Sequence, residues 1–124
     1  MEPLVRVHPS VAQARDRFHP DTVAQVRDAI ARDRVVVVGM AGNPFVRKAR
    51  TLLTERGTPF TYLEFGGYLS QWKPRLALKI WAGWPTFPMV FVGGMLVGGY
   101  KDLKALAQSG ELDTLLAGGG AQVG

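Results

Sequence analysis

The chemistry open to this chain is limited first by a residue type that it lacks. None of its 124 residues is cysteine, which excludes disulfide bonds, thiolate metal ligands and a cysteine nucleophile. The two histidines, His8 and His19, belong to no paired set of ligands, so we expect no metal site and no cofactor. No serine, histidine and acid can be assigned to a common hydrolytic site either.

A candidate site of another kind lies where a run of valines meets a turn. Val35 to Val38 predict a strand that is covered on both faces, and the turn Gly42-Asn43-Pro44 follows it. Asparagine is a common N-cap residue and proline suits the first position of a helix, so we expect a helix to begin at this turn. The turn lacks the Gly-Lys-Ser/Thr ending of a phosphate loop, and nucleotide binding is not predicted.

The elements that position these residues follow from hydrophobic periodicity and from glycine and proline. Asp21 is the expected N-cap of the first helix, and Gly93-Gly94 between two short strands is a strong hairpin signal. We predict a helix over 21–32, a strand over 34–39, a helix from 44 that ends before 57, a strand over 60–65, a helix over 70–81, strands over 88–92 and 95–97, and helical segments over 102–108 and 112–116.

Composition indicates one globular domain. The chain is 47% hydrophobic and 20% charged, and its length suits a single core. We divide it into an N-terminal extension over 1–19, a domain over 20–117 and a flexible glycine-rich tail over 118–124. The start lacks the basic and apolar regions of a secretory signal, and the apolar stretch from Leu76 to Gly99 is broken by prolines and glycines. We therefore expect a cytoplasmic protein that does not enter a membrane.

The basic residues do not predict a nucleic-acid partner. Lysine and arginine number 15 against 10 acids, a net charge of +5, but they are dispersed along the chain. The cluster Arg47-Lys48-Arg50 is typical of the solvated face of a helix.

Three local motifs and the order of the elements resemble the glutaredoxin family, especially its single-cysteine members. The motifs are the turn Asn43-Pro44-Phe45-Val46, the segment Trp84-Pro85-Thr86-Phe87-Pro88, and the pair Gly98-Gly99 followed by Asp102. The resemblance covers about residues 21–117. It implies an α/β, thioredoxin-like fold with a four-stranded mixed sheet and helices on both faces, and a cis peptide bond before Pro88.

The departures from the family pattern fall on its active-site turn. In the resembled family a nucleophilic cysteine stands where this chain has Asn43, a resolving cysteine or serine stands at Val46, and a lysine stands at Met40. A carboxamide is not a nucleophile and is no soft ligand for iron, so we expect neither thiol–disulfide exchange nor an iron–sulfur cluster. No residue is predicted to be catalytic, and Asn43 and Val46 are degenerate active-site positions.

The resemblance also implies a glutathione cleft that relies on backbone and charge. The residues implied are Arg75, Thr86, Phe87, Pro88, Gly98, Gly99, Lys101 and Asp102, with Lys79 as a weaker candidate. The segment before Pro88 would pair with the cysteinyl unit, the start of the last helix would hold the γ-glutamyl end, and Arg75 would meet the glycyl carboxylate. Each residue has a structural alternative: Pro88 shapes the fold, Asp102 stabilises a helix N-terminus, and Arg75 lies on a solvated face.

Two functions remain open from the sequence. The first is a redox-inactive binding module for glutathione, an extended peptide or a protein partner. The alternative is a glutathione-dependent enzyme, transferase-like or electron-transferring, in which glutathione supplies the thiol and Asn43 donates one hydrogen bond. Trp72, Trp84 and Phe45 are candidates for partner contacts, whereas Trp81 is expected in the core.

Overall fold

The computed structural model describes residues 8–11 and 18–118. The expected extension over 1–19 and tail over 118–124 therefore lie largely outside the described residues. Within them, the last helix includes Gly118, the first residue assigned to the tail.

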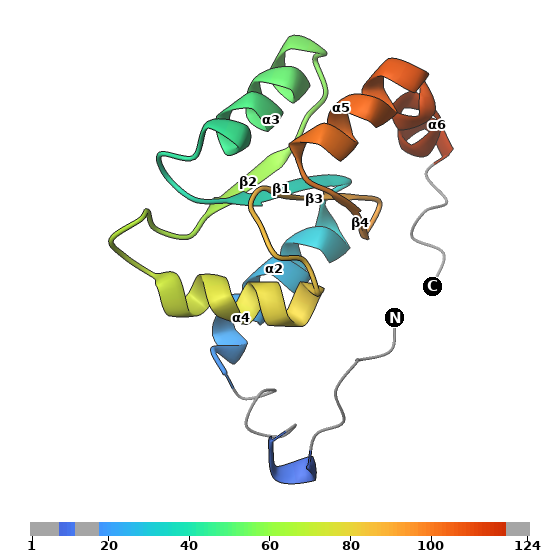
Figure 1. The fold of residues 1–124 in the computed structure, drawn as a ribbon. Coiled ribbons are helices and arrows are strands. Elements are labelled where there is room, and N and C mark those ends of the chain that lie inside the picture. The colour runs from blue at the N-terminus through green and yellow to red at the C-terminus, as the bar shows by residue number, and fades with distance from the viewer. Residues whose placement is uncertain (1–7, 12–17, 119–124) are drawn as a thin grey trace.

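Four strands form one mixed sheet in the order β2-β1-β3-β4 (Figure 1). β1 (Val35–Gly39) pairs in parallel with β2 (Thr61–Glu64) and antiparallel with β3 (Met89–Val92), which pairs antiparallel with β4 (Met95–Gly98). Every residue of β1 is buried, as the unbroken run of valines predicts. The hairpin between β3 and β4 turns at Gly93 and Gly94, which both have positive φ, so the predicted turn is confirmed.

Helices cover both faces of this sheet (Figure 1). α2 (Pro20–Arg32) and α4 (Trp72–Ala82) lie on one face, and α3 (Pro44–Glu55), α5 (Tyr100–Ser109) and α6 (Glu111–Gly118) lie on the other. The predicted fold class, a thioredoxin-like α/β fold with a four-stranded mixed sheet and helices on both faces, is confirmed.

Two hydrophobic cores result from the alternation of side chains along the strands. Val36 and Val38 pack with the residues of α2 and α4, whereas Val35 and Val37 pack with those of α3, α5 and α6. Successive side chains of a strand point to opposite faces, so one short run of valines supplies both cores. The start of α3 is thereby held directly beyond the end of the best-buried strand.

Four predicted helix starts are wrong by one or two residues, including that of α6, which begins at Glu111 and not at 112. The first helix begins at Pro20 after His19, whose φ of 49° places it in the left-handed region, so Asp21 is not its N-cap. α4 begins at Trp72, two residues later than predicted. α5 begins at Tyr100, two residues earlier than predicted, because the backbone N–H of Gly99 donates to the Asp102 carboxylate and brings Gly99 to the cap position.

Candidate functional site

The turn after β1 is organised by the side chain of Asn43. Its Oδ1 accepts hydrogen bonds from the backbone N–H groups of Phe45 at 2.9 Å and Val46 at 3.1 Å. Pro44 occupies the first turn of α3, where no N–H is required. The N-cap interpretation of Asn43 is confirmed: a neutral oxygen satisfies two N–H groups at the positive end of the helix.

Val46, the other degenerate position, belongs to the core. Its side chain is 2% exposed and packs against the end of β1. A Cβ added to Gly39 would stand 2.6 Å from Val46 Cγ1, so the strand end and the first turn of α3 are in close contact. This position faces protein on all sides and is not open to a ligand.

A cavity of about 460 Å³ opens beside Asn43. Most of the residues expected to bind glutathione line it: Thr86, Phe87, Pro88, Gly99, Lys101 and Asp102. Met40, Asn43, Phe45, Lys79, Trp84, Pro85 and Tyr100 complete the wall. The fold therefore brings together the end of β1, the start of α3, the loop before β3 and the start of α5.

The loop before β3 supplies one wall through its backbone. The Phe87–Pro88 peptide bond is cis, as the resemblance implies. Phe87 is 7% exposed and packs in the core between the sheet and the helices α2 and α4, while Thr86 remains exposed beside the cavity. Lys79 of α4 approaches this wall from the face of the sheet that α2 and α4 cover, with its Nζ 5.7 Å from the centre of the Phe87 ring.

The start of α5 forms a neighbouring part of the wall, in contact with Trp84 and Pro88 at Gly99. The Asp102 carboxylate accepts the Gly99 N–H at 2.9 Å. The first backbone N–H groups of α5 have no partner within the helix, and they lie at the end of α5 that borders the cavity. Gly98 lies behind this contact, with φ of 119°, and a Cβ there would stand 2.3 Å from the Asp102 carboxylate. Gly98 is thus required by the path of the backbone and does not line the cavity.

Arg75 is placed away from the cavity. It is 7% exposed, and its Nη1 donates to the backbone carbonyl oxygens of Phe65 at 2.8 Å and Ser70 at 2.6 Å. The guanidinium therefore fastens the loop between β2 and α4. The solvated-face alternative also fails, because this arginine is buried.

Trp84, which the sequence marks as a candidate for partner contacts, contributes a buried polar group. Its indole Nε1–H is buried and has no acceptor among the residues that the structure describes. Trp84 lines the cavity next to Gly99. A tryptophan N–H usually finds an acceptor when it is buried, so this unpaired donor is an exception among the described residues, and it lies behind the surface of the cavity.

The other aromatic residues divide between surface and core. Phe45 and Trp72 are 47% and 60% exposed, whereas Trp81 packs on Phe91 with ring centres 6.0 Å apart. The expectation that Trp81 belongs to the core is confirmed. The described residues contain no group of three or more histidine, aspartate or glutamate side chains placed to hold a metal ion.

Comparison with known proteins adds the family. No family model matches the sequence. A glutaredoxin-like protein from Dictyostelium discoideum is 43% identical over 99 residues, which cover 80% of this chain and 80% of that protein. This chain belongs to the glutaredoxin family. The resemblance stated from its motifs is therefore confirmed.

Solved glutaredoxin structures share the fold. The crystal structure of a wheat glutaredoxin superposes with a TM-score of 0.69 at 32% identity, covering 82% of this chain and 96% of the wheat chain. A buckwheat glutaredoxin in complex with glutathione superposes with a TM-score of 0.70 at 21% identity, covering 82% and 93%. In this glutaredoxin an asparagine caps the helix after β1, and none of the 124 residues is a cysteine. No helix among the described residues is long and apolar enough to span a membrane.

Proposed function

We propose that this glutaredoxin is a redox-inactive binding module whose cavity takes glutathione. The observation that carries the proposal is the convergence of the loop before Pro88 and the start of α5 on one cavity next to Asn43. The loop offers backbone groups that pair with an extended peptide, and the helix start offers N–H groups for a carboxylate. Neither contribution requires a thiol from the protein.

The charges of the cavity match those of the tripeptide. Lys79 and Lys101 are the cations of its wall and Asp102 is its anion. Glutathione carries two carboxylates and one ammonium group at neutral pH, so each of its charges finds an opposite partner. Met40 stands where the resembled family has a lysine, and the loss of one charge-assisted contact weakens binding by about 1.5–3 kcal/mol.

A relative of the same fold supports the same proposal. The buckwheat glutaredoxin of the same fold is a complex with glutathione, which also favours this ligand. We assign the module to the cytoplasm, where thiols are kept reduced and glutathione is at hand.

Titration of the ¹⁵N-labelled protein with reduced glutathione tests the proposal. We expect amide shifts at Phe87, Gly99, Lys101 and Asp102, and none at Arg75, whose guanidinium is bonded to the loop before α4. S-methylglutathione should bind within about twofold of glutathione, because the protein provides no thiol partner for the sulfur. The indole N–H signal of Trp84 should move in both titrations.

Charge variants give the control. Lys101→Glu should weaken glutathione binding about tenfold, whereas Arg27→Glu on the exposed surface of α2 makes the same charge change on the other face of the sheet and should leave the affinity unchanged. Absence of shifts at the cavity with millimolar glutathione would overturn the binding proposal.

Activity assays address the redox-inactive part separately. Reduction of a small disulfide with glutathione should not exceed the rate without protein. Turnover above that rate would refute redox inactivity. Conjugation of glutathione to an aromatic electrophile above the uncatalysed rate would refute the binding module in favour of a transferase.

A further inference from the structure

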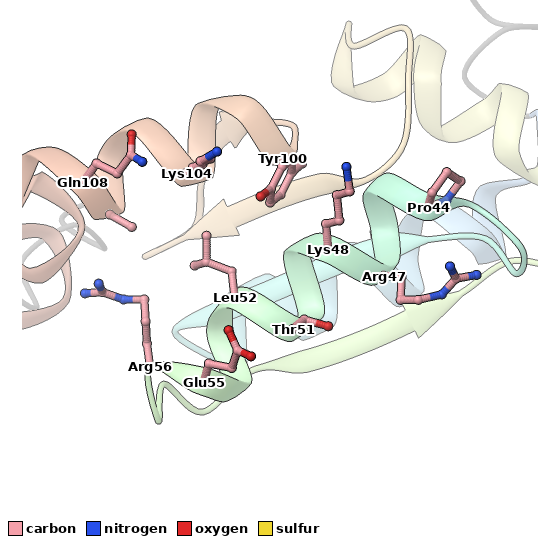
Figure 2. Close-up of a pocket in the computed structure, with 11 residues that line it drawn as sticks. Pro44, Arg47, Lys48, Thr51, Leu52, Glu55, Arg56, Tyr100, Lys104 and Gln108 are labelled. Atoms are coloured by element: carbon pink, nitrogen blue, oxygen red, sulfur yellow. The ribbon is translucent and has the colours of Figure 1, made fainter.

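A second hollow lies between α3 and α5 (Figure 2), and Tyr100 lines both this hollow and the cavity beside Asn43. Its volume is about 650 Å³. We call it the α3–α5 groove, lined by Pro44, Arg47, Lys48, Thr51, Leu52, Glu55 and Arg56 of α3 and by Tyr100, Lys104, Ala107 and Gln108 of α5.

The side chains that line the α3–α5 groove carry mainly positive charge. Its wall contains four cationic side chains and the single acid Glu55. Arg56 is already paired, because its Nη2 lies 2.6 Å from the carboxylate of Asp113. For Lys48 and Lys104, by contrast, no acid of the described residues lies within salt-bridge distance. Two lysines on facing helices are thus left to bind a negative group from outside.

The position of Lys48 is supported by two aromatic rings. Its Nζ lies 5.3 Å from the centre of the Phe45 ring and 5.9 Å from that of Tyr100. Cation–π contacts at these distances hold the ammonium group over the end of the groove without neutralising it. The charge is therefore partly ordered before a ligand arrives, which lowers the entropy cost of binding.

The floor of the groove is apolar. Leu52 and Ala107 are both half-buried and pack against the core beneath α3 and α5. Figure 2 shows Leu52 directed from α3 toward α5, between Lys48 and Arg56. A ligand that fills the groove must therefore present an apolar side chain to the floor and anions to the rims.

We propose that the α3–α5 groove binds an acidic segment of a partner protein. Its carboxylates meet Lys48 and Lys104, and an aliphatic side chain between them covers Leu52 and Ala107. A nucleic acid fits less well, because the apolar floor offers its phosphates no donor. A second copy of this chain is disfavoured as the partner by the net charge of +5. The proposal does not depend on glutathione binding.

Fluorescence polarisation with synthetic peptides tests this proposal. The probe is a fluorescein-labelled peptide of alternating glutamate and leucine, and the matched probe carries glutamine in place of glutamate. We expect the glutamate peptide to bind at least about tenfold more tightly, because only carboxylates pair with the lysines. Amide shifts in the ¹⁵N-labelled protein should map to Thr51, Lys104 and Gln108.

Two double charge reversals separate a site from general attraction. Lys48→Glu with Lys104→Glu should lower the affinity for the glutamate peptide at least about tenfold. Arg27→Glu with Lys73→Glu changes the net charge equally on α2 and α4, across the sheet, and should lower it by less than about threefold. Amide spectra of both variants verify that the fold is intact.

Three results would overturn the proposal. These are equal losses of affinity in the two double variants, equal binding of the glutamine peptide, and tighter binding of a single-stranded oligonucleotide in the groove. The glutathione titration of the unaltered protein is a separate measurement, so failure of one proposal leaves the other standing.

Discussion

Replacement of Asn43 by cysteine gives the most direct test of how the start of α3 works. The wild-type side chain already accepts two backbone N–H groups, from Phe45 and Val46. A thiolate at this position would inherit both donors and the positive end of the helix dipole. Because the chain has no cysteine of its own, Asn43→Cys contains a single thiol that can be followed without interference.

The size of the effect follows from these two donors. A hydrogen bond to a charged group contributes about 1.5–3 kcal/mol, and the helix dipole about 0.3–1 kcal/mol. A preference of about 2 kcal/mol for the thiolate, less than the sum of these contributions because the neutral thiol also accepts the two N–H groups, lowers the thiol pKa from about 8.5 to about 7. Lys79 and Lys101 in the cavity wall act in the same direction, and Asp102 opposes them.

The pH dependence of alkylation by iodoacetamide, together with thiolate absorbance, measures this pKa. Thr54→Cys, at the opposite end of the same helix, is the control and should have a pKa close to the unperturbed value of about 8.5. Unfolding by urea provides a second measurement. The pKa in the folded Asn43→Cys protein is lower than in its unfolded chain, so its stability should rise by about 2 kcal/mol as the pH increases from about 6 to about 9.

A pKa of 8.5 or higher in a correctly folded Asn43→Cys protein would refute this reasoning. It would mean that the N–H groups bonded to Asn43 do not redirect to an anion. Equal pKa values at positions 43 and 54 would have the same consequence, because the helix end would then contribute nothing.

Three further predictions concern stability. Arg75→Leu should lower the free energy of unfolding by about 2–3 kcal/mol in urea, because two carbonyl oxygens lose their donor. Burial, and then the hydrogen bond to Glu64, raises the pKa of Tyr62 to about 12. The phenol proton is therefore lost at lower pH in the unfolded chain than in the folded protein. The free energy of unfolding, measured with urea, should fall by up to about 1 kcal/mol between about pH 10 and 12, and this fall should be absent in Tyr62→Phe. Gly39→Ala should cost about 1–3 kcal/mol in thermal or urea unfolding by overpacking Val46, and the added substitution Val46→Ala should recover part of it.

The fold was largely predictable because its strongest signals are local. The valine run of β1, the Asn43-Pro44 start of α3 and the Gly93-Gly94 hairpin each depend on a few adjacent residues. The helix starts were less accurate where tertiary contacts decide them. α5 begins early because the Asp102 side chain reaches back to Gly99, a contact that periodicity does not report.

The position of the cavity wall was predictable where backbone segments with recognisable motifs form it. It was not predictable where a side chain can hydrogen-bond to several alternative acceptors. The loop before Pro88 and the start of α5 converge as expected. Arg75 lies outside the cavity because its acceptors, the carbonyls of Phe65 and Ser70, depend on the path of a loop that the sequence does not show. The α3–α5 groove was missed because Lys48 and Lys104 are far apart in sequence, and only the packing of their helices makes them neighbours.

Asn43 and Val46, the two altered positions of the active-site turn, differ in how easily each can accept a cysteine side chain. Asn43 stands at the rim of a cavity, and a thiol there replaces one helix cap by another. Val46 is enclosed and in close contact with Gly39, so a smaller sulfhydryl at that point would leave a void in the core. A single substitution at position 43 thus places a thiol at the rim of the cavity, whereas a second thiol at position 46 would also disturb the packing between the end of β1 and the first turn of α3.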